Sequence, residues 1–233
     1  MVFGSRRMSL KMPDFKLSLL GKEIIPAQTV RDLGVTFDPT LSFDNHISAT
    51  VSSCMLKLSQ LSRIRFAFNK DLLETIINAL VFSKMSCCSS VRSSTSACNV
   101  HKLQYVQNFA ARIICNVKKY DHISSTLRNL RWLPVKSILY YRDATLSFKC
   151  KTGLAPEYLT SELVKGGSVS GRITRNFQQL NIPLFKTTTG QRTFYYRSVA
   201  IWNKLDSRLK LCEKPVSLKR ALKMHLLNDF LFK

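Results

Sequence analysis

Apolar side chains recur at helical spacing along this chain, and this periodicity limits the folds open to it. In the segment 102–134 they stand three or four residues apart, as on one face of a helix, at Leu103, Val106, Ala110, Ile113, Ile114 and Val117. Two earlier stripes have the same spacing, one at Ile47, Val51, Cys54, Leu58 and Leu61 and the other at Leu73, Ile76, Ile77 and Leu80. Helices with one apolar face pack against each other, so the sequence predicts a helical bundle.

Strands are favoured in one stretch near the N-terminus. Residues 15–19 alternate apolar and polar side chains, Gly21 and Lys22 supply a turn, and residues 23–35 return. Pro26 confines the returning strand to an edge, because proline has no backbone N–H to donate. The predicted fold class is therefore mainly α with a small N-terminal β-hairpin, an α+β arrangement.

Capping signals place several helix ends. Asp71, followed by Glu74 three residues later, has the pattern of a capping box. Pro134 suits the start of a later helix that Gly153 would end. From these signals we divide the chain into a β-hairpin at 1–40, a helical bundle at 41–120, and a helical C-terminal region at 121–233 with a polar loop at 168–193.

The chain is strongly basic. It has 36 Lys and Arg against 14 Asp and Glu, a formal net charge of +22. Internal ion pairs cannot absorb this excess, and phosphate neutralisation makes nucleic acid the favoured partner. An anionic membrane surface or a merely soluble basic protein are the alternatives. Because no apolar run is long enough for a spanning helix and residues 1–12 lack an apolar signal core, we predict an intracellular chain without a membrane partner.

Enzyme motifs are absent from the sequence. No two aspartates are adjacent, so the paired carboxylates that hold catalytic metal ions in a polymerase are missing, and no phosphate-binding loop or hydrolase motif occurs. Asp121 beside His122 has the composition of a base and its orienting partner, but a helix cap next to a surface histidine is the favoured interpretation. We therefore predict no catalytic residue.

The seven cysteines do not describe a disulfide framework, because their number is odd and their spacing irregular. Cys87, Cys88, Cys98 and His101 are the candidate zinc ligands, since Cys98 and His101 have a permissible separation. The adjacent pair Cys87-Cys88 lacks the usual two-residue gap. Incidental cysteines are therefore favoured, and neither a metal nor another cofactor is predicted.

Basic side chains next to aromatic ones indicate where nucleic acid would bind, because cations neutralise phosphates and rings stack on bases. The predicted contacts are Lys57, Arg63, Arg65, Arg112, Lys118, Lys119, Arg192 and Arg197. They stand near Phe66, Tyr120, Tyr195 and Tyr196. The competing interpretation is a solvated helix face for each charged run and core packing for the rings, which we favour for Trp202.

Several widely spaced segments occur in an order typical of one protein family. They are VRDLGV at 30–35, LSFDNHI at 41–47, YDHI at 120–123, RWLPV at 131–135, GLAPEYL at 153–159 and IWNKL at 201–205. This set resembles the post-catalytic region of reverse transcriptases from LINE-type (non-LTR) retrotransposons, the jockey-like group, over nearly the whole chain. The serine-rich segment 86–95 departs from the family, which usually has an acidic-aromatic-Cys run and a Leu-Tyr-Gly turn there.

The resemblance implies a truncated RNA-directed DNA polymerase that lacks its catalytic palm and keeps a basic thumb for an RNA or DNA primer–template duplex. Leu33, Gly34 and Val35 would form the primer-grip turn, with Gly34 allowing close backbone approach. A palm, separate or upstream, would be a partner, and Mg²⁺ is implied for an intact parent enzyme. The alternatives are a co-opted nucleic-acid-binding protein and a translated remnant without function.

Overall fold

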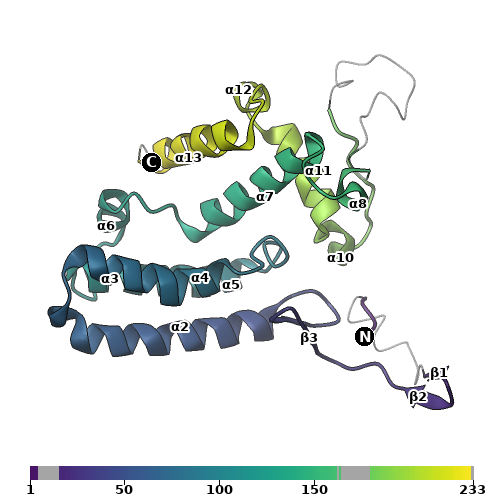
Figure 1. Ribbon diagram of the computed structural model, residues 1–233, viewed down its shortest axis with the longest axis horizontal. Helices are drawn as coiled ribbons and strands as arrows, with labels where there is room; N and C mark the ends of the chain where they lie inside the picture. The colour runs from purple at the N-terminus through teal and green to yellow at the C-terminus, as the bar shows by residue number, and fades with distance from the viewer. Residues whose placement is uncertain (5–15, 162, 164–178, 232–233) are drawn as a thin grey trace.

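The computed structural model describes residues 1–4, 16–161, 163 and 179–231 (Figure 1). In these ranges the chain is mainly helical and has two small β-hairpins near the N-terminus, which confirms the predicted fold class. The predicted strand residue Phe15 and residues 168–178 of the predicted polar loop lie outside the described residues. Within the described part, no helix is both long and apolar enough to cross a membrane.

The N-terminal strands form two hairpins, so the prediction of one hairpin is wrong in this detail. The strands are β1 (Leu17–Leu19), β2 (Lys22–Ile24), β3 (Val30–Asp32) and β4 (Val35–Phe37), and β1 pairs with β2 and β3 with β4. Pro26 lies in the connection between the hairpins. Leu20 and Gly21 make the first turn, and Leu33 and Gly34 make the second. All four have positive φ, as a turn that follows the twist of its strands requires.

The helices follow in two groups. The first comprises α2 (Asp44–Ile64), the short η1 (Arg65–Ala67), α3 (Lys70–Ile77), the π-helix η2 (Asn78–Phe82), α4 (Ser83–Ser86), α5 (Ala97–Cys115) and α6 (Ser124–Asn129). The second comprises α7 (Val135–Lys151), α8 (Glu157–Thr160), α10 (Thr188–Gln191), α11 (Phe194–Lys204), α12 (Ser207–Lys210) and α13 (Pro215–Leu231). In Figure 1, α2 lies below α3 and α4, whereas α7 and α13 lie above them.

Helices α2, α3, η2 and α5 share one apolar core, which confirms the predicted stripes with one shift. Leu80 was expected in the core, but it is exposed and Val81 is buried instead. The π-turn causes this shift, because its wider winding rotates the following side chains relative to an α-helix. The cap of α3 also differs from the prediction, since the Asn69 side chain, not Asp71, accepts a hydrogen bond from the backbone N–H of Leu72 at 2.8 Å.

A second core joins α7, α11, α12 and α13. As predicted, α7 begins directly after Pro134, and Gly153 follows its end with a φ of 70°. Trp202 is buried in this core, with 8% of its surface exposed, which confirms its predicted packing role. Part of the predicted polar loop is instead the short helix α10, where the Thr187 hydroxyl accepts a hydrogen bond from the N–H of Gly190.

A third, smaller cluster connects the two groups of helices. It contains Val35 from β4, Ile47 from α2, Leu103 from α5, and Val135 and Leu139 from α7. The cluster packs the second hairpin and α7 against the first helical group. It therefore fixes the position of α7 above α5, and the clefts described below lie along this junction.

Candidate nucleic-acid interface

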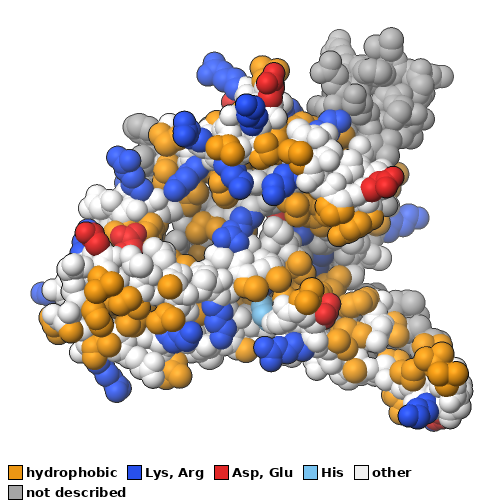
Figure 2. Space-filling model, in the orientation of Figure 1, with side chains coloured by type: hydrophobic (Ala, Val, Ile, Leu, Met, Phe, Trp, Pro, Cys, Tyr) orange, Lys and Arg blue, Asp and Glu red, His pale blue; other side chains and the backbone are white. Residues whose placement is uncertain are grey.

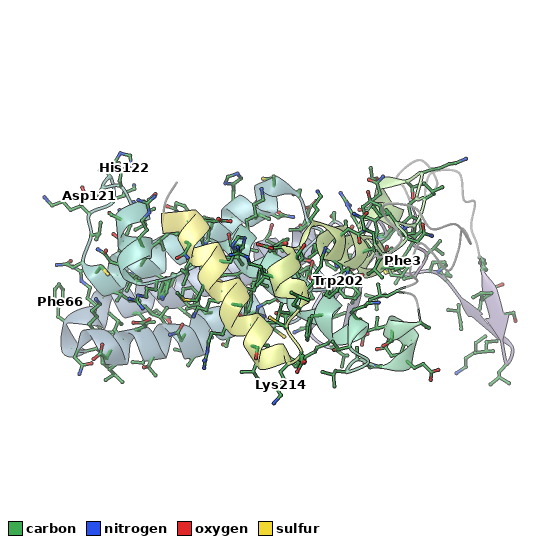
Figure 3. All side chains as sticks on the ribbon, turned by 90° about the horizontal axis from the view of Figure 1, so that it is seen from above. Phe3, Phe66, Asp121, His122, Trp202 and Lys214 are labelled. Carbon is green, nitrogen blue, oxygen red and sulfur yellow. The ribbon has the colours of Figure 1, made fainter. Side chains whose placement is uncertain are left out.

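Two of the predicted basic segments lie at the same end of the α2–α3–α5 bundle. The connection from α2 to α3 and the chain after α5 both lie there, and Figure 3 shows Phe66, Asp121 and His122 at this end. Phe68 in the connection from α2 to α3 and Cys115 at the end of α5 pack against the same core. We call residues 63–70 and 118–122 the bundle tip.

The aromatic side chains of the bundle tip face solvent. Phe66 is 82% exposed and Tyr120 is 90% exposed. A cation lies over each ring: the Arg65 guanidinium carbon is 4.7 Å from the Phe66 centroid, and Lys119 Nζ is 5.5 Å from the Tyr120 centroid. Exposed rings next to cations are the arrangement in which bases stack while phosphates are neutralised.

Arg112 of α5 holds the loop 118–121 of the bundle tip by hydrogen bonds. Its guanidinium donates hydrogen bonds to the carbonyls of Lys118 and of Asp121, the latter at 2.8 Å. The Asp121 carboxylate accepts from the backbone N–H of Lys118 at 3.2 Å, so Asp121 closes this turn. The prediction that Asp121 caps a helix is wrong, since α6 has no side-chain cap. His122 is exposed, as expected for a surface neighbour.

The third predicted segment lies at the opposite end of the fold and is bound to protein groups. Arg192 Nη1 donates to the Thr40 carbonyl at 3.0 Å. Arg197 Nη1 lies 3.5 Å from Asp143 Oδ2, and Arg197 Nη2 donates to the Ser90 carbonyl at 2.8 Å. The Arg197 side chain is 13% exposed. Arg192 and Arg197 are therefore not part of the surface that we propose below.

Lys57 lies apart from the bundle tip. Its Nζ is 3.4 Å from the Leu80 carbonyl of η2, and Lys84 of α4 reaches back to the Ser53 hydroxyl of α2 at 2.7 Å. These two lysines bridge α2 and the η2–α4 segment. Both keep their charge at the surface, which places Lys57 on the side of the bundle and not at its end.

The segment that resembles a primer grip is the turn of the second hairpin. Leu33 and Gly34 are its central residues, Leu33 is exposed, and Gly34 has a φ of 83°. Val35 is instead buried in the cluster with Ile47 and Leu103. The three residues thus form a hairpin turn whose tip faces solvent and whose last residue anchors it to the helices.

The candidate zinc ligands do not form a metal site in the structure. The Cys87 and Cys88 sulfurs are 3.8 Å apart, and Cys98 and His101 are exposed at the start of α5. Among the described residues, no three His, Cys, Asp or Glu side chains are close enough to hold a metal ion.

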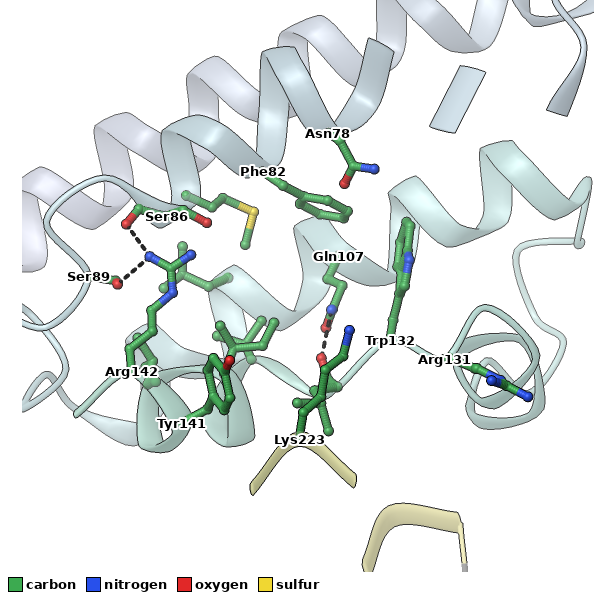
Figure 4. Close-up of a pocket in the computed structure, with 16 residues that line it drawn as sticks. Asn78, Phe82, Ser86, Ser89, Gln107, Arg131, Trp132, Tyr141, Arg142 and Lys223 are labelled. Carbon is green, nitrogen blue, oxygen red and sulfur yellow. Dashed lines mark hydrogen bonds between the residues drawn. The ribbon is translucent and has the colours of Figure 1, made fainter. Parts of the chain in front are cut away.

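A cleft of about 310 Å³ lies between the η2–α4 segment and the helices α7 and α13 (Figure 4). Its interior is apolar, and there Phe82 and Trp132 meet edge to face with ring centroids 4.8 Å apart. Arg131, Arg142 and Lys223 also line it. We call this the apolar cleft. None of its described lining residues is acidic; the nearby Glu74 carboxylate accepts a hydrogen bond from Trp132 Nε1 at 3.3 Å.

A second cleft, of about 460 Å³, shares Ser86, Ser89, Tyr141 and Arg142 with the first. Lys149 of α7 and Lys219 of α13 complete its charged lining, and again none of the described lining residues is acidic. We call it the serine cleft. Figure 2 shows blue Lys and Arg side chains spread over α7 and α13 on this face, with few acidic ones.

Arg92 directly follows Val91, which lines the serine cleft, but its own side chain is buried, with 1% of its surface exposed. Its Nη2 donates to the Met85 carbonyl, but its Nε and Nη1 have no hydrogen-bond partner among the described residues. Burial lowers the pKa of Arg92, and the neighbouring Arg142 lowers it further. The two guanidinium groups repel each other, and neither has a carboxylate partner in the described part of the chain.

Sequence reasoning missed the cations of these clefts. Arg131, Arg142, Lys149, Lys219 and Lys223 come from distant parts of the chain, and most of them lack an adjacent exposed ring. The available signal was the run of basic residues along α13, which Lys219 and Lys223 share at helical spacing. Comparison with models of protein families, with curated proteins and with solved structures finds no match for this chain.

Proposed function

We propose that this chain binds nucleic acid through the phosphate backbone, as the helical region behind the palm does in LINE-type reverse transcriptases. The observation that carries the proposal is the bundle tip. Arg63, Arg65 and Lys119 stand there together with Phe66 and Tyr120, although the two segments are more than fifty residues apart in the sequence.

The charge balance supports the same conclusion. The formal net charge is +22, and the buried ion pair of the described chain, Arg197–Asp143, neutralises a single cation. Most other cations among the described residues are at the surface, where bound phosphates would release their counterions. The ordered family-like segments at 30–35, 120–123 and 201–205 favour a primer–template duplex as the ligand.

One observation favours the alternative of a remnant without independent function. The first hairpin and the residue after it expose five apolar side chains, namely Leu17, Leu19, Leu20, Ile24 and Ile25. Exposed apolar surface of this kind is typical of a segment that has lost its packing partner. A remnant of this kind would aggregate and would not bind nucleic acid specifically.

The test is fluorescence anisotropy of a labelled primer–template duplex titrated with the purified chain across a salt series. We expect micromolar or tighter binding whose logarithm falls linearly with the logarithm of salt concentration. The double variant Arg63→Glu, Arg65→Glu should reduce the slope by about 2, because about one counterion is released per phosphate contact.

The matched control is Lys204→Glu, Arg208→Glu, which makes the same charge change at exposed positions on α11 and α12. It should retain the parental slope to within about 1, because it changes the net charge equally but removes no phosphate contact of the bundle tip. Equal losses in both double variants would contradict a bundle-tip interface. Aggregation of the parent, or no binding at low salt, would favour the remnant.

A further inference from the structure

The apolar cleft and the serine cleft are two compartments of one basic depression. Tyr141 and Arg142 of α7 line both, and so do Ser86 and Ser89. One compartment is walled by aromatic and aliphatic side chains, and the other by hydroxyls and cations. We propose that the depression binds one unstacked nucleotide, with its base in the apolar cleft and its phosphate in the serine cleft. This inference rests on the proposal that the chain binds nucleic acid, and it names the part of that ligand which the clefts recognise.

The apolar cleft suits a base by size and by lining. Its volume of about 310 Å³ is at the lower end of small-molecule pockets, which hold ligands larger than a single base. The Phe82 and Trp132 rings and the Tyr141 ring border it (Figure 4). Aromatic walls bind the face of any base, because every base has a π-face.

The buried amide of the apolar cleft, Gln107, argues for weak base selectivity. Gln107 Nε2 already donates to the Leu133 carbonyl at 2.9 Å, and its Oε1 accepts from Gln104 Nε2 at 2.9 Å. The Gln107 amide is thus engaged within the protein and does not present a free edge to a base. We therefore expect the cleft to accept purines and pyrimidines by stacking and apolar contact.

The serine cleft suits a phosphate group. Arg142 Nη1 donates to the Ser86 carbonyl at 2.6 Å and to the Ser89 hydroxyl at 2.9 Å, and these two bonds fix the guanidinium at the boundary of the compartments (Figure 4). Lys149 and Lys219 bring two further positive charges. Guanidinium and ammonium groups around hydroxyls are the donors that phosphate oxygens accept from.

Arg92 gives a second, independent reason to place an anion there. This nearly fully buried cation has unpaired N–H groups and repels Arg142. A phosphate held by Arg142 in the serine cleft would lower this repulsion, because charge interactions are weakly screened away from bulk water.

The decisive measurement compares two labelled pentanucleotides: one with all five positions abasic, and one with a single thymine at the centre. Anisotropy titrations should show binding about tenfold tighter for the strand with one base, because stacking on aromatic side chains contributes about 1–3 kcal/mol per base. Asn78→Trp, which fills the mouth of the apolar cleft from η2, should abolish this preference and leave binding of the abasic strand unchanged.

A double variant of the two lysines in the serine cleft tests the phosphate compartment. Lys149→Glu, Lys219→Glu changes both of these cations, whereas Lys214→Glu, Arg220→Glu makes the same charge change at exposed positions outside the clefts. The first variant should weaken both pentanucleotides at least about tenfold more than the second, by the phosphate contacts that it removes. Thermal unfolding followed by circular dichroism checks that all variants fold.

Competition with a free nucleotide distinguishes a site for free nucleotides from a site for a nucleotide within a strand. Displacement of the one-base strand by uridine monophosphate, but not by equal inorganic phosphate, would show that a free nucleotide also fits. Failure of uridine monophosphate to compete would assign the site to nucleotides within a strand. Equal competition by phosphate alone, or equal affinity for the two pentanucleotides, would overturn the proposal.

The proposed function can fail independently of this inference. Arg63→Glu, Arg65→Glu should weaken duplex binding while the preference for the strand with one base persists. Duplex binding without that preference would refute the nucleotide site and leave the bundle-tip proposal standing. A preserved preference for the strand with one base, without duplex binding, would refute the bundle-tip proposal and leave the nucleotide site standing.

Discussion

Two segments of similar composition have opposite structural roles in this protein. Arg63-Ile64-Arg65-Phe66 ends α2 at the surface, and its ring and second guanidinium contact each other. The segment from Arg192 to Arg197 also combines arginines with aromatic rings, but its Arg197 pairs with Asp143 and its Tyr195 packs against a core. The first is available to a ligand, whereas the second holds helices together.

A carboxylate and a set of hydroxyls account for the difference. Asp143 on α7 is buried, and the Ser93 hydroxyl donates to its Oδ2 at 2.6 Å. Arg197 donates to Ser93 and to the Ser90 carbonyl, so the serine-rich segment is the third side of the same network. The serine-rich segment thus has a structural role: it joins α7 to α11.

The largest expected effect in this comparison is on apolar packing. Trp202→Ala should lower the free energy of unfolding by about 3–5 kcal/mol, because it leaves a cavity in the core that Trp202 shares with Phe148 and Leu222. Phe66→Ala at the exposed bundle tip should change it by less than about 0.5 kcal/mol. Urea unfolding followed by circular dichroism measures both. Similar losses in the two variants would mean that the bundle tip is also a packing surface.

A loss of about 3 kcal/mol is expected for Asp143→Ala, because Arg197 would remain buried without its partner. Arg63→Ala, which removes an exposed cation, should cost less than about 0.5 kcal/mol. The double variant Asp143→Leu, Arg197→Met should recover much of the loss, since a buried ion pair can be replaced by apolar side chains. If the double variant were no more stable than Asp143→Ala, the contrast between the two arginine segments would not rest on this pair.

The smallest expected effect on stability is at Asp38, in the loop whose Thr40 carbonyl accepts a hydrogen bond from Arg192. Burial raises the pKa of Asp38, but hydrogen bonds to Thr40, Ser42 and Phe43 outweigh burial and hold it below its usual value. Because the folded pKa is depressed, the stabilisation is fully present above the unfolded value near 3.8 and is lost as the pH falls through the folded value.

Asp38→Asn should therefore cost about 1 kcal/mol at neutral pH, the typical value of a lost hydrogen bond, and it should flatten the acid side of the stability profile. Urea midpoints measured from neutral to acidic pH would show this, with the exposed Asp229→Asn as control. A steep acid profile that survives in Asp38→Asn would assign the acid sensitivity to another carboxylate.

The helical core was predictable because apolar spacing is a local property of the chain. Leu58, Leu103 and Ile113 are buried where their stripes predicted. The hairpin count and the register after Ile77 were not predictable by the same rule. Two turns of positive φ at Leu-Gly pairs set the number of hairpins, and one π-turn set the register. Neither feature can be recognised from the spacing of apolar residues.

The candidate site divides in the same way. Arg65 with Phe66 and Lys119 with Tyr120 were visible as neighbours in sequence, and the structure adds that these pairs share one end of the bundle. The cations of the clefts were not visible, because no local pattern links Arg142 to Lys219.

The sequence by itself determined the mainly helical fold, the buried stripes and the excess of positive charge, because each depends on residue type and short spacing. The tertiary structure decided which cations remain free. Arg197 meets Asp143 across more than fifty residues, whereas Arg63 meets no carboxylate among the described residues. Whether a guanidinium binds its own protein or a phosphate depends on what folding brings within a few ångströms of it, and only long-range packing determines that.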